Sequence, residues 1–92
     1  MQNKIRVLLV EDEEHLQEAL KLNLELEGYA VSVSGNGKEA LSLFHEGRFN
    51  LVILDVMLPE MDGFSVCRAI RLTDTRVPVL FLTAKDTTAD KI

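Results

Sequence analysis

The sequence contains a single cysteine, no tryptophan and no long apolar run. Cys67 has no second cysteine to pair with, so a disulfide framework and a metal site built on thiolates are both excluded, and a reduced, cytoplasmic protein is expected. The apolar run Ile5–Val10 is too short for a signal peptide and is followed at once by acidic residues. No apolar stretch approaches the length of a membrane-spanning helix, so no membrane contact is expected.

Basic residues are also fewer than acidic residues. Lysine and arginine number 10 against 15 aspartates and glutamates, which gives a formal net charge of −5 at pH 7. Because proteins bind nucleic acids largely by neutralising phosphates with lysine and arginine, this segment is not expected to bind nucleic acid directly. The chain has 92 residues, of which 47% are hydrophobic, and this suits one small domain with a single core. One domain is therefore predicted over residues 1–92.

Short apolar runs alternate along the chain with longer amphipathic stretches. Strands are predicted at 5–10, 30–34, 51–54 and 77–82, with helices between them. Glycines are expected to end the first two helices, near positions 28 and 47. The apolar positions of the three helices are Leu16, Leu20 and Leu24 with Ala19, Leu22 and Leu26 beside them; then Ala40, Leu41 and Phe44; and finally Phe64, Cys67 and Ile70 or Val66 and Ile70.

This alternation predicts an α/β fold, in which a doubly wound parallel sheet carries helices on both faces. The continuous apolar runs 5–10 and 51–54 suit strands buried on both faces, whereas the alternating run 30–34 suits a half-exposed edge strand. With right-handed crossovers, the predicted strand order is 2-1-3-4. All four strands then end at the same edge of the sheet.

Carboxylates follow two of the predicted strands. Glu11 and Asp12 come directly after the first strand, and Asp55 comes directly after the third. Because these strands are expected to be neighbours, the three side chains should share one crevice. At ~4 Å and an effective dielectric near 20, each pair of like charges costs about 4 kcal/mol, so a cation or protons must relieve the cluster. Oxygen ligands of this kind suit Mg²⁺.

A simpler interpretation exists for each acid taken alone. An aspartate after a strand often caps the next turn or helix, and this applies to Asp55. Glu13 and Glu14 are interpreted as the first turn of a helix, where acids interact favourably with the helix dipole. His15 and His45 fall on predicted helices without the spacing of metal ligands, so both are expected at the surface.

Thr83 and Lys85 follow the fourth strand and add a hydroxyl and an ammonium group to the same edge. Together with the acidic pair at 11 and 12, the segments Asp55–Gly63 and Leu82–Ala84 make the whole chain similar to the receiver domain of two-component response regulators. The resemblance implies a flavodoxin-like receiver fold. It also implies that the chain is incomplete, because the family has five βα units and residue 92 falls near the start of the fourth helix. The fifth strand and helix, which carry an invariant lysine, would be missing, and Lys85 is not that lysine.

The resemblance also implies a mechanism. Asp55 would accept a phosphoryl group from a phosphohistidine on a partner sensor histidine kinase. Asp12 and Asp55 would bind Mg²⁺ directly, Glu11 would bind it through water, and the backbone carbonyl of Met57 would complete the protein ligands. Thr83 would contact the phosphoryl group and act as the switch. Such a domain is not an enzyme in the ordinary sense but a signalling switch, which often controls a DNA-binding output domain.

Two other functions remain open. A phosphorylation-independent interaction module could keep this fold, although such proteins usually lose one of the acids, and none is lost here. An aspartate-nucleophile phosphohydrolase typically has a second aspartate two residues after the first, where this chain has Met57. A dinucleotide-binding domain is excluded because Glu11–Glu14 contains no glycine. The apolar strand 77–82 would lie at the sheet edge, so the chain is expected to self-associate around this strand or to be partly unfolded.

Overall fold

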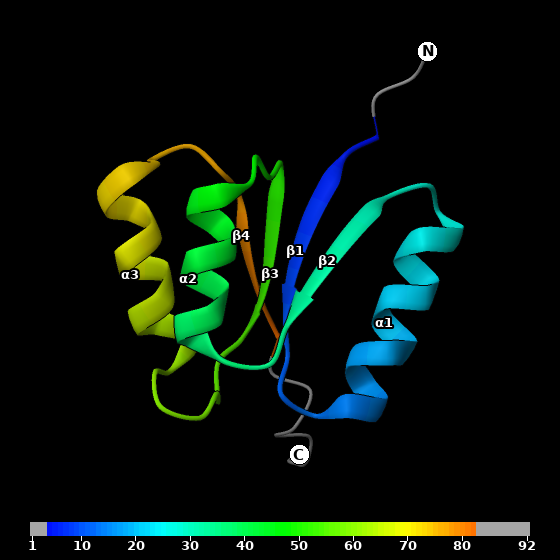
Figure 1. Ribbon diagram of the computed structural model, residues 1–92, viewed down its shortest axis with the longest axis horizontal. Coiled ribbons are helices and arrows are strands. Elements are labelled where there is room, and N and C mark those ends of the chain that lie inside the picture. The colour runs from blue at the N-terminus through cyan, green and yellow to red at the C-terminus, as the bar shows by residue number, and fades with distance from the viewer. Residues whose placement is uncertain (1–3, 83–92) are drawn as a thin grey trace, which may run out of the picture.

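The fold is a four-stranded parallel sheet with helices on both faces. The computed structural model describes residues 4–82 of the chain. Strands and helices alternate from one end of this part to the other, as predicted (Figure 1). The elements are β1 (Arg6–Val10), α1 (Glu14–Leu26), β2 (Ala30–Ser34), α2 (Gly37–Glu46), β3 (Leu51–Asp55), α3 (Gly63–Thr73) and β4 (Val79–Leu82).

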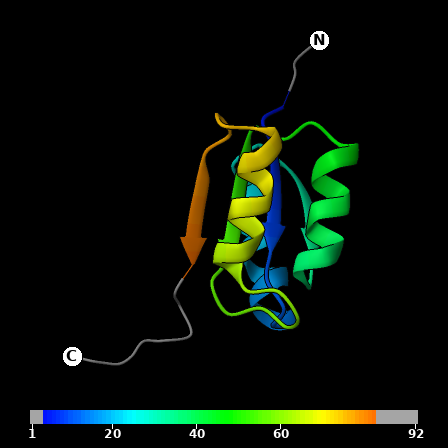
Figure 2. The same ribbon diagram turned by 90° about the vertical axis from the view of Figure 1, so that its left-hand side faces the viewer.

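The strand order is β2-β1-β3-β4, which confirms the predicted flavodoxin-like arrangement. All pairings are parallel, so the strands end together at the lower edge in Figure 1. Helix α1 lies on one face of the sheet, and α2 and α3 lie on the other. Figure 2 shows β4 at one margin of the described sheet.

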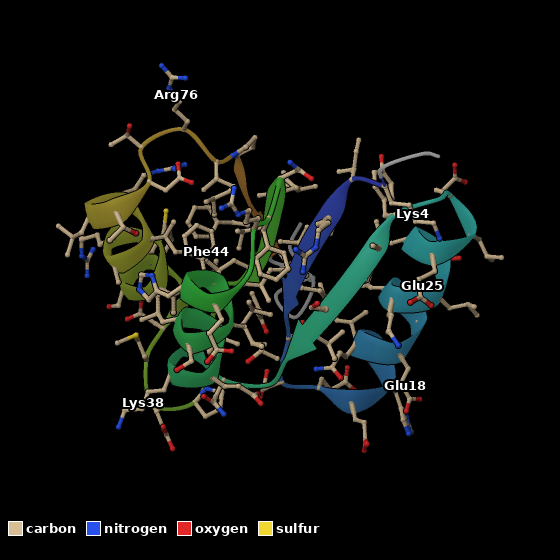
Figure 3. The ribbon with its side chains drawn as sticks, turned by 45° about the horizontal axis from the view of Figure 1, so that its top comes forward. Lys4, Glu18, Glu25, Lys38, Phe44 and Arg76 are labelled. Atoms are coloured by element: carbon tan, nitrogen blue, oxygen red, sulfur yellow. The ribbon has the colours of Figure 1, made fainter. Side chains whose placement is uncertain are left out.

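The core consists of two layers because successive side chains of a strand point to opposite faces. Strands β1 and β3 are buried on both faces, as their continuous apolar runs predicted. Phe44 of α2 lies between its helix and the sheet, whereas Glu18, Glu25 and Arg76 point outward (Figure 3). The layer under α2 and α3 contains Leu8, Val10, Ala40, Phe44, Val52, Leu54, Val66, Ile70 and Val77. The layer under α1 contains Val7, Leu9 and Ile53.

Helix α1 contacts the sheet through a narrower stripe than the sequence predicted. Leu20 and Leu24 pack against the core, but Leu22 is 58% exposed and Leu26 is 74% exposed. The reason is the helical rotation of about 100° per residue, which turns positions 22 and 26 away from positions 20 and 24. None of the described helices is both long enough and apolar enough to cross a bilayer.

Helix α3 uses the second of its two predicted apolar stripes. Val66 and Ile70 are fully buried, whereas Cys67 is only partly buried and Phe64 is 51% exposed. The Phe64 ring instead contacts the ring of Phe81 on β4, with centroids 5.0 Å apart. The amino-terminal end of this helix is therefore tied to the neighbouring strand.

Two strands begin later than predicted, at Arg6 and at Val79. The prediction that β4 starts at Val77 is wrong because Pro78 has no N–H with which to join a ladder. Pro78 accepts a hydrogen bond from the Val52 N–H (3.0 Å) through its carbonyl oxygen, and Val77 instead donates its N–H to the Asp74 carboxylate at 2.9 Å. Val77 is nevertheless buried in the core.

Candidate functional site

Three carboxylates meet where β1 and β3 end. These strands are neighbours, and Val10 is in register with Leu54. Glu11 is the first residue after β1, whereas Asp55 is the last residue of β3, which ends one residue later than predicted. One carboxylate oxygen from each of Glu11, Asp12 and Asp55 lies within 4.8 Å of the other two. Glu11 and Asp55 are 1% and 2% exposed, whereas Asp12 is open to solvent. The predicted convergence of these acids at one edge of the sheet is therefore found.

The loop after β3 folds back onto the strand. The Met57 N–H donates a hydrogen bond of 3.1 Å to Oδ1 of Asp55, and the Gly63 N–H donates one of 2.8 Å to the Val56 carbonyl. The Val56 N–H in turn donates to the Leu82 carbonyl of β4 (3.3 Å). Asp55 thus stands at the start of a closed loop that is joined to the neighbouring strand.

The same loop contains an unusual turn. Glu60 has a φ of 71°, in the left-handed region that non-glycine residues rarely adopt. The residues before and after Glu60 are hydrogen-bonded to each other: the Met61 N–H donates to the Pro59 carbonyl at 2.8 Å, which closes a turn of three residues. Nothing in the sequence predicts this conformation, because glutamate has no preference for the left-handed region.

Asp62 is the residue that caps the start of helix α3. Its Oδ1 accepts a hydrogen bond of 2.8 Å from the Ser65 N–H at the start of α3. This backbone hydrogen bond holds the pKa of Asp62 below its usual value. Asp55 accepts an N–H from the loop that follows it but does not cap α3, so the simpler interpretation of an aspartate as a helix cap describes Asp62 instead.

The loop after β1 is held by β2 and α1. The Glu11 N–H donates to the Ser34 carbonyl at 3.0 Å, and Oε2 of Glu11 accepts the Glu13 N–H at 2.8 Å. The side-chain amide of Gln17 donates to the Glu11 carbonyl at 2.8 Å and to the Ser34 carbonyl at 3.3 Å. Sequence reasoning missed Gln17 and Ser34, because neither belongs to a motif or to an apolar stripe.

The electrostatics of the cluster favour a hard cation. The oxygens lie within 4.8 Å of one another, so at an effective dielectric of 20 each pair of charged carboxylates repels by about 3.5 kcal/mol or more. Two of the three groups are also buried, where charge is stable only if it is compensated. The cluster offers carboxylate oxygens and no sulfur or imidazole nitrogen, and this donor set fits Mg²⁺.

Residues 7–92 match the response regulator receiver domain. The chain belongs to this family. It is 48% identical over 89 residues to the uncharacterized transcriptional regulatory protein YkoG of Bacillus subtilis, covering 97% of this chain and 39% of YkoG. The receiver domain therefore spans well under half the length of that relative. Curated relatives of this receiver domain include transcriptional regulators.

Solved receiver structures have the same fold. The non-phosphorylated HemR receiver domain from Leptospira biflexa has a TM-score of 0.84 and 41% identity, covering 92% of this chain and 68% of that one. TrrA from Thermotoga maritima, in complex with Mg²⁺-BeF, has a TM-score of 0.84 and 40% identity, covering 87% of this chain and 70% of TrrA. The complex of TrrA with the histidine kinase ThkA has a TM-score of 0.83 and 39% identity, covering 89% of this chain and 71% of that one.

The hydrogen bonds and distances at the site do not test the role of every predicted site residue. Met57 is 61% exposed and donates its N–H to Asp55, but its carbonyl as a metal ligand stays a prediction. Thr83 and Lys85 lie outside the described residues. His15 and His45 are exposed, as predicted.

Proposed function

We propose that Asp55 is the phosphoacceptor of a Mg²⁺-dependent signalling switch. A carboxylate oxygen of Asp55 attacks the phosphorus of a phosphohistidine, the P–N bond breaks, and the imidazole leaves with its electron pair and takes up a proton. The product is an aspartyl phosphate. The observation that supports this most directly is the burial of Asp55 at a strand end, with carboxylate oxygens of Glu11 and Asp12 within 4.8 Å.

The same three acids are proposed to hold the metal. Asp12 and Asp55 would bind Mg²⁺ directly, Glu11 through water, and Met57 through its carbonyl. When bound, the ion neutralises the carboxylates and the phosphoryl oxygens, which is the main source of catalysis in phosphoryl transfer. The presence of Mg²⁺-BeF in the complex of TrrA supports this assignment by similarity.

The phosphodonor is proposed to be a sensor histidine kinase, by analogy with the complex of TrrA and ThkA. Thr83 is proposed to donate a hydrogen bond to the phosphoryl group and so to report its arrival. Because the chain covers 39% of YkoG, we further propose that it belongs to a longer cytoplasmic regulator with a DNA-binding output domain. All three acids are present, which argues against an interaction module without phosphorylation.

Phosphorylation by acetyl phosphate tests this proposal. With Mg²⁺ present, intact-mass measurement should show one added phosphoryl group that is lost in base and retained in acid. Asp55→Asn should abolish the addition. Asp62→Asn is the matched control, because it changes the aspartate at the far end of the loop that follows Asp55, and its amide oxygen can still cap α3. Phosphorylation that persists in Asp55→Asn, or that proceeds equally in EDTA, would contradict the assignment.

A further inference from the structure

Gln17 connects three elements at the acidic edge of the sheet. It is half-buried on α1, and its amide nitrogen donates to the carbonyl oxygens of Glu11 (2.8 Å) and Ser34 (3.3 Å). Both neighbours are acceptors, so only the NH₂ end of the amide can face them. One side chain thus bridges the end of β1, the end of β2 and the first turns of α1.

These bonds hold the peptide groups on both sides of Glu11. The Glu11 N–H is bound to the Ser34 carbonyl at 3.0 Å, and the Glu11 carbonyl is bound to Gln17 at 2.8 Å. Each peptide group is planar, so fixing its N–H or its carbonyl fixes the orientation of the whole unit. The second of these peptide groups leads directly into Asp12. The directions in which Glu11 and Asp12 leave the backbone are therefore set in part by Gln17.

A backbone held in this way has a consequence for metal binding. The three carboxylates repel one another, and Asp12 is open to solvent, so a loosely held loop would relax by moving Asp12 away from Asp55. Bringing the acids together again would then cost free energy and weaken the binding of the ion. A preorganised loop avoids this loss.

We propose that Gln17 is a positioning residue for the magnesium site, a role that rests on the proposed function of the acidic cluster. It touches neither the ion nor the phosphoryl group, and acts through the Glu11–Asp12 backbone. Outer partners that orient metal ligands typically affect metal affinity by roughly 10–100-fold. Because Gln17 acts on the backbone and not on a ligand atom, a loss near the lower end, roughly tenfold, is expected when its donor is removed.

The test substitution is Gln17→Met in the full chain. Methionine has a similar length and helix propensity but cannot donate a hydrogen bond. The matched control is Leu20→Ala, one turn along the same helix, which weakens the packing of α1 on the sheet without touching the acidic loop. The dissociation constant for Mg²⁺ is measured by NMR titration of the folded species, and urea unfolding is measured for each variant.

Gln17→Met should weaken Mg²⁺ binding about tenfold, while Leu20→Ala should lose more stability and keep its Mg²⁺ affinity within about twofold. Equal loss of Mg²⁺ affinity in the two variants would overturn the proposal, because Gln17 would then only anchor α1. Unchanged affinity in Gln17→Met, with a wild-type chain that binds Mg²⁺ and is phosphorylated, would overturn this proposal alone. A wild-type chain that does not bind Mg²⁺ would overturn the proposed function together with it.

Discussion

Gly63 lies directly against the backbone of Asp55. A Cβ atom added at position 63 would stand 2.3 Å from the Asp55 carbonyl oxygen and 2.9 Å from the Cα of Val56. These are backbone atoms, so no flexible side chain can move aside to make room. The absence of a side chain at Gly63 is therefore what allows the loop to close behind the proposed phosphoacceptor.

Gly63→Ala should destabilise the protein, although alanine stabilises a helix by about 1 kcal/mol relative to glycine. Overpacking against backbone costs about 1–3 kcal/mol and should outweigh that gain, so the net loss in the free energy of unfolding should reach about 2 kcal/mol. Urea denaturation measures this loss. Gly35→Ala is the control, because nothing lies within 4 Å of its added Cβ, and it should change the stability by less than about 0.5 kcal/mol. Equal stability in the two variants would contradict the close contact.

The magnesium site predicts a defined set of NMR shifts. Titration with Mg²⁺ should move the amide signals of Glu11, Asp12, Asp55 and Met57 before those of the rest of the chain. Asp12→Asn removes one charge from the cluster and should weaken binding. Glu18→Gln on the outer face of α1 removes the same charge away from the site and should leave the affinity unchanged. Undisturbed signals at the four positions would contradict the site.

The cap of α3 predicts a dependence on pH. The Ser65 N–H lowers the folded-state pKa of Asp62 below its ordinary value of 3.8. The carboxylate therefore stabilises the fold above the unfolded-state pKa, and this contribution is lost as the pH falls through the lower, folded-state pKa. Asp62→Ala should be less stable than wild type at pH 7, and the difference should shrink in acid. Thermal unfolding at a series of pH values measures it, and a difference that is constant with pH would contradict the assignment.

The outer strand β4 predicts self-association of the 92-residue chain. β4 lies at one margin of the described sheet, and its Leu80 is 55% exposed. Exposed apolar edges recruit other strands, and a charge on them opposes pairing. Leu80→Lys should therefore shift the chain toward monomer in sedimentation velocity at micromolar concentration. Leu72→Lys changes a leucine of α3 that is 86% exposed and should have no such effect. A wild-type chain that is strictly monomeric would refute the prediction.

The parts of this structure that could be predicted from sequence are those encoded by neighbouring residues. The apolar runs before Glu11 and Asp55 predict two strands. They also predict that these acids lie close together, because parallel strands end at one edge of the sheet. The start of β4 is predicted wrongly at Val77, because apolarity marks burial and not hydrogen bonding, and Val77 is buried outside the ladder.

Other features depend on contacts that are distant in the sequence. Gln17 bonds to Ser34 across 17 positions, and no local pattern distinguishes it from a solvated helix residue. The positive φ of Glu60 is imposed by the closed loop, since glutamate has no preference for that region. The same limit applies to Leu22 and Leu26. The periodicity predicts that both widen the apolar stripe of α1, but the rotation of the helix on the sheet leaves both exposed.

In the proposed function, Asp55 carries the phosphoryl group. After phosphorylation with acetyl phosphate and Mg²⁺, borohydride reduces an aspartyl phosphate to homoserine, and peptide mass spectrometry locates the converted residue. The result expected is homoserine at position 55 and at no other aspartate, with no conversion when Mg²⁺ is withheld. Conversion at Asp12 or Asp62 with Asp55 intact, or no conversion in a folded chain supplied with Mg²⁺, would contradict the account.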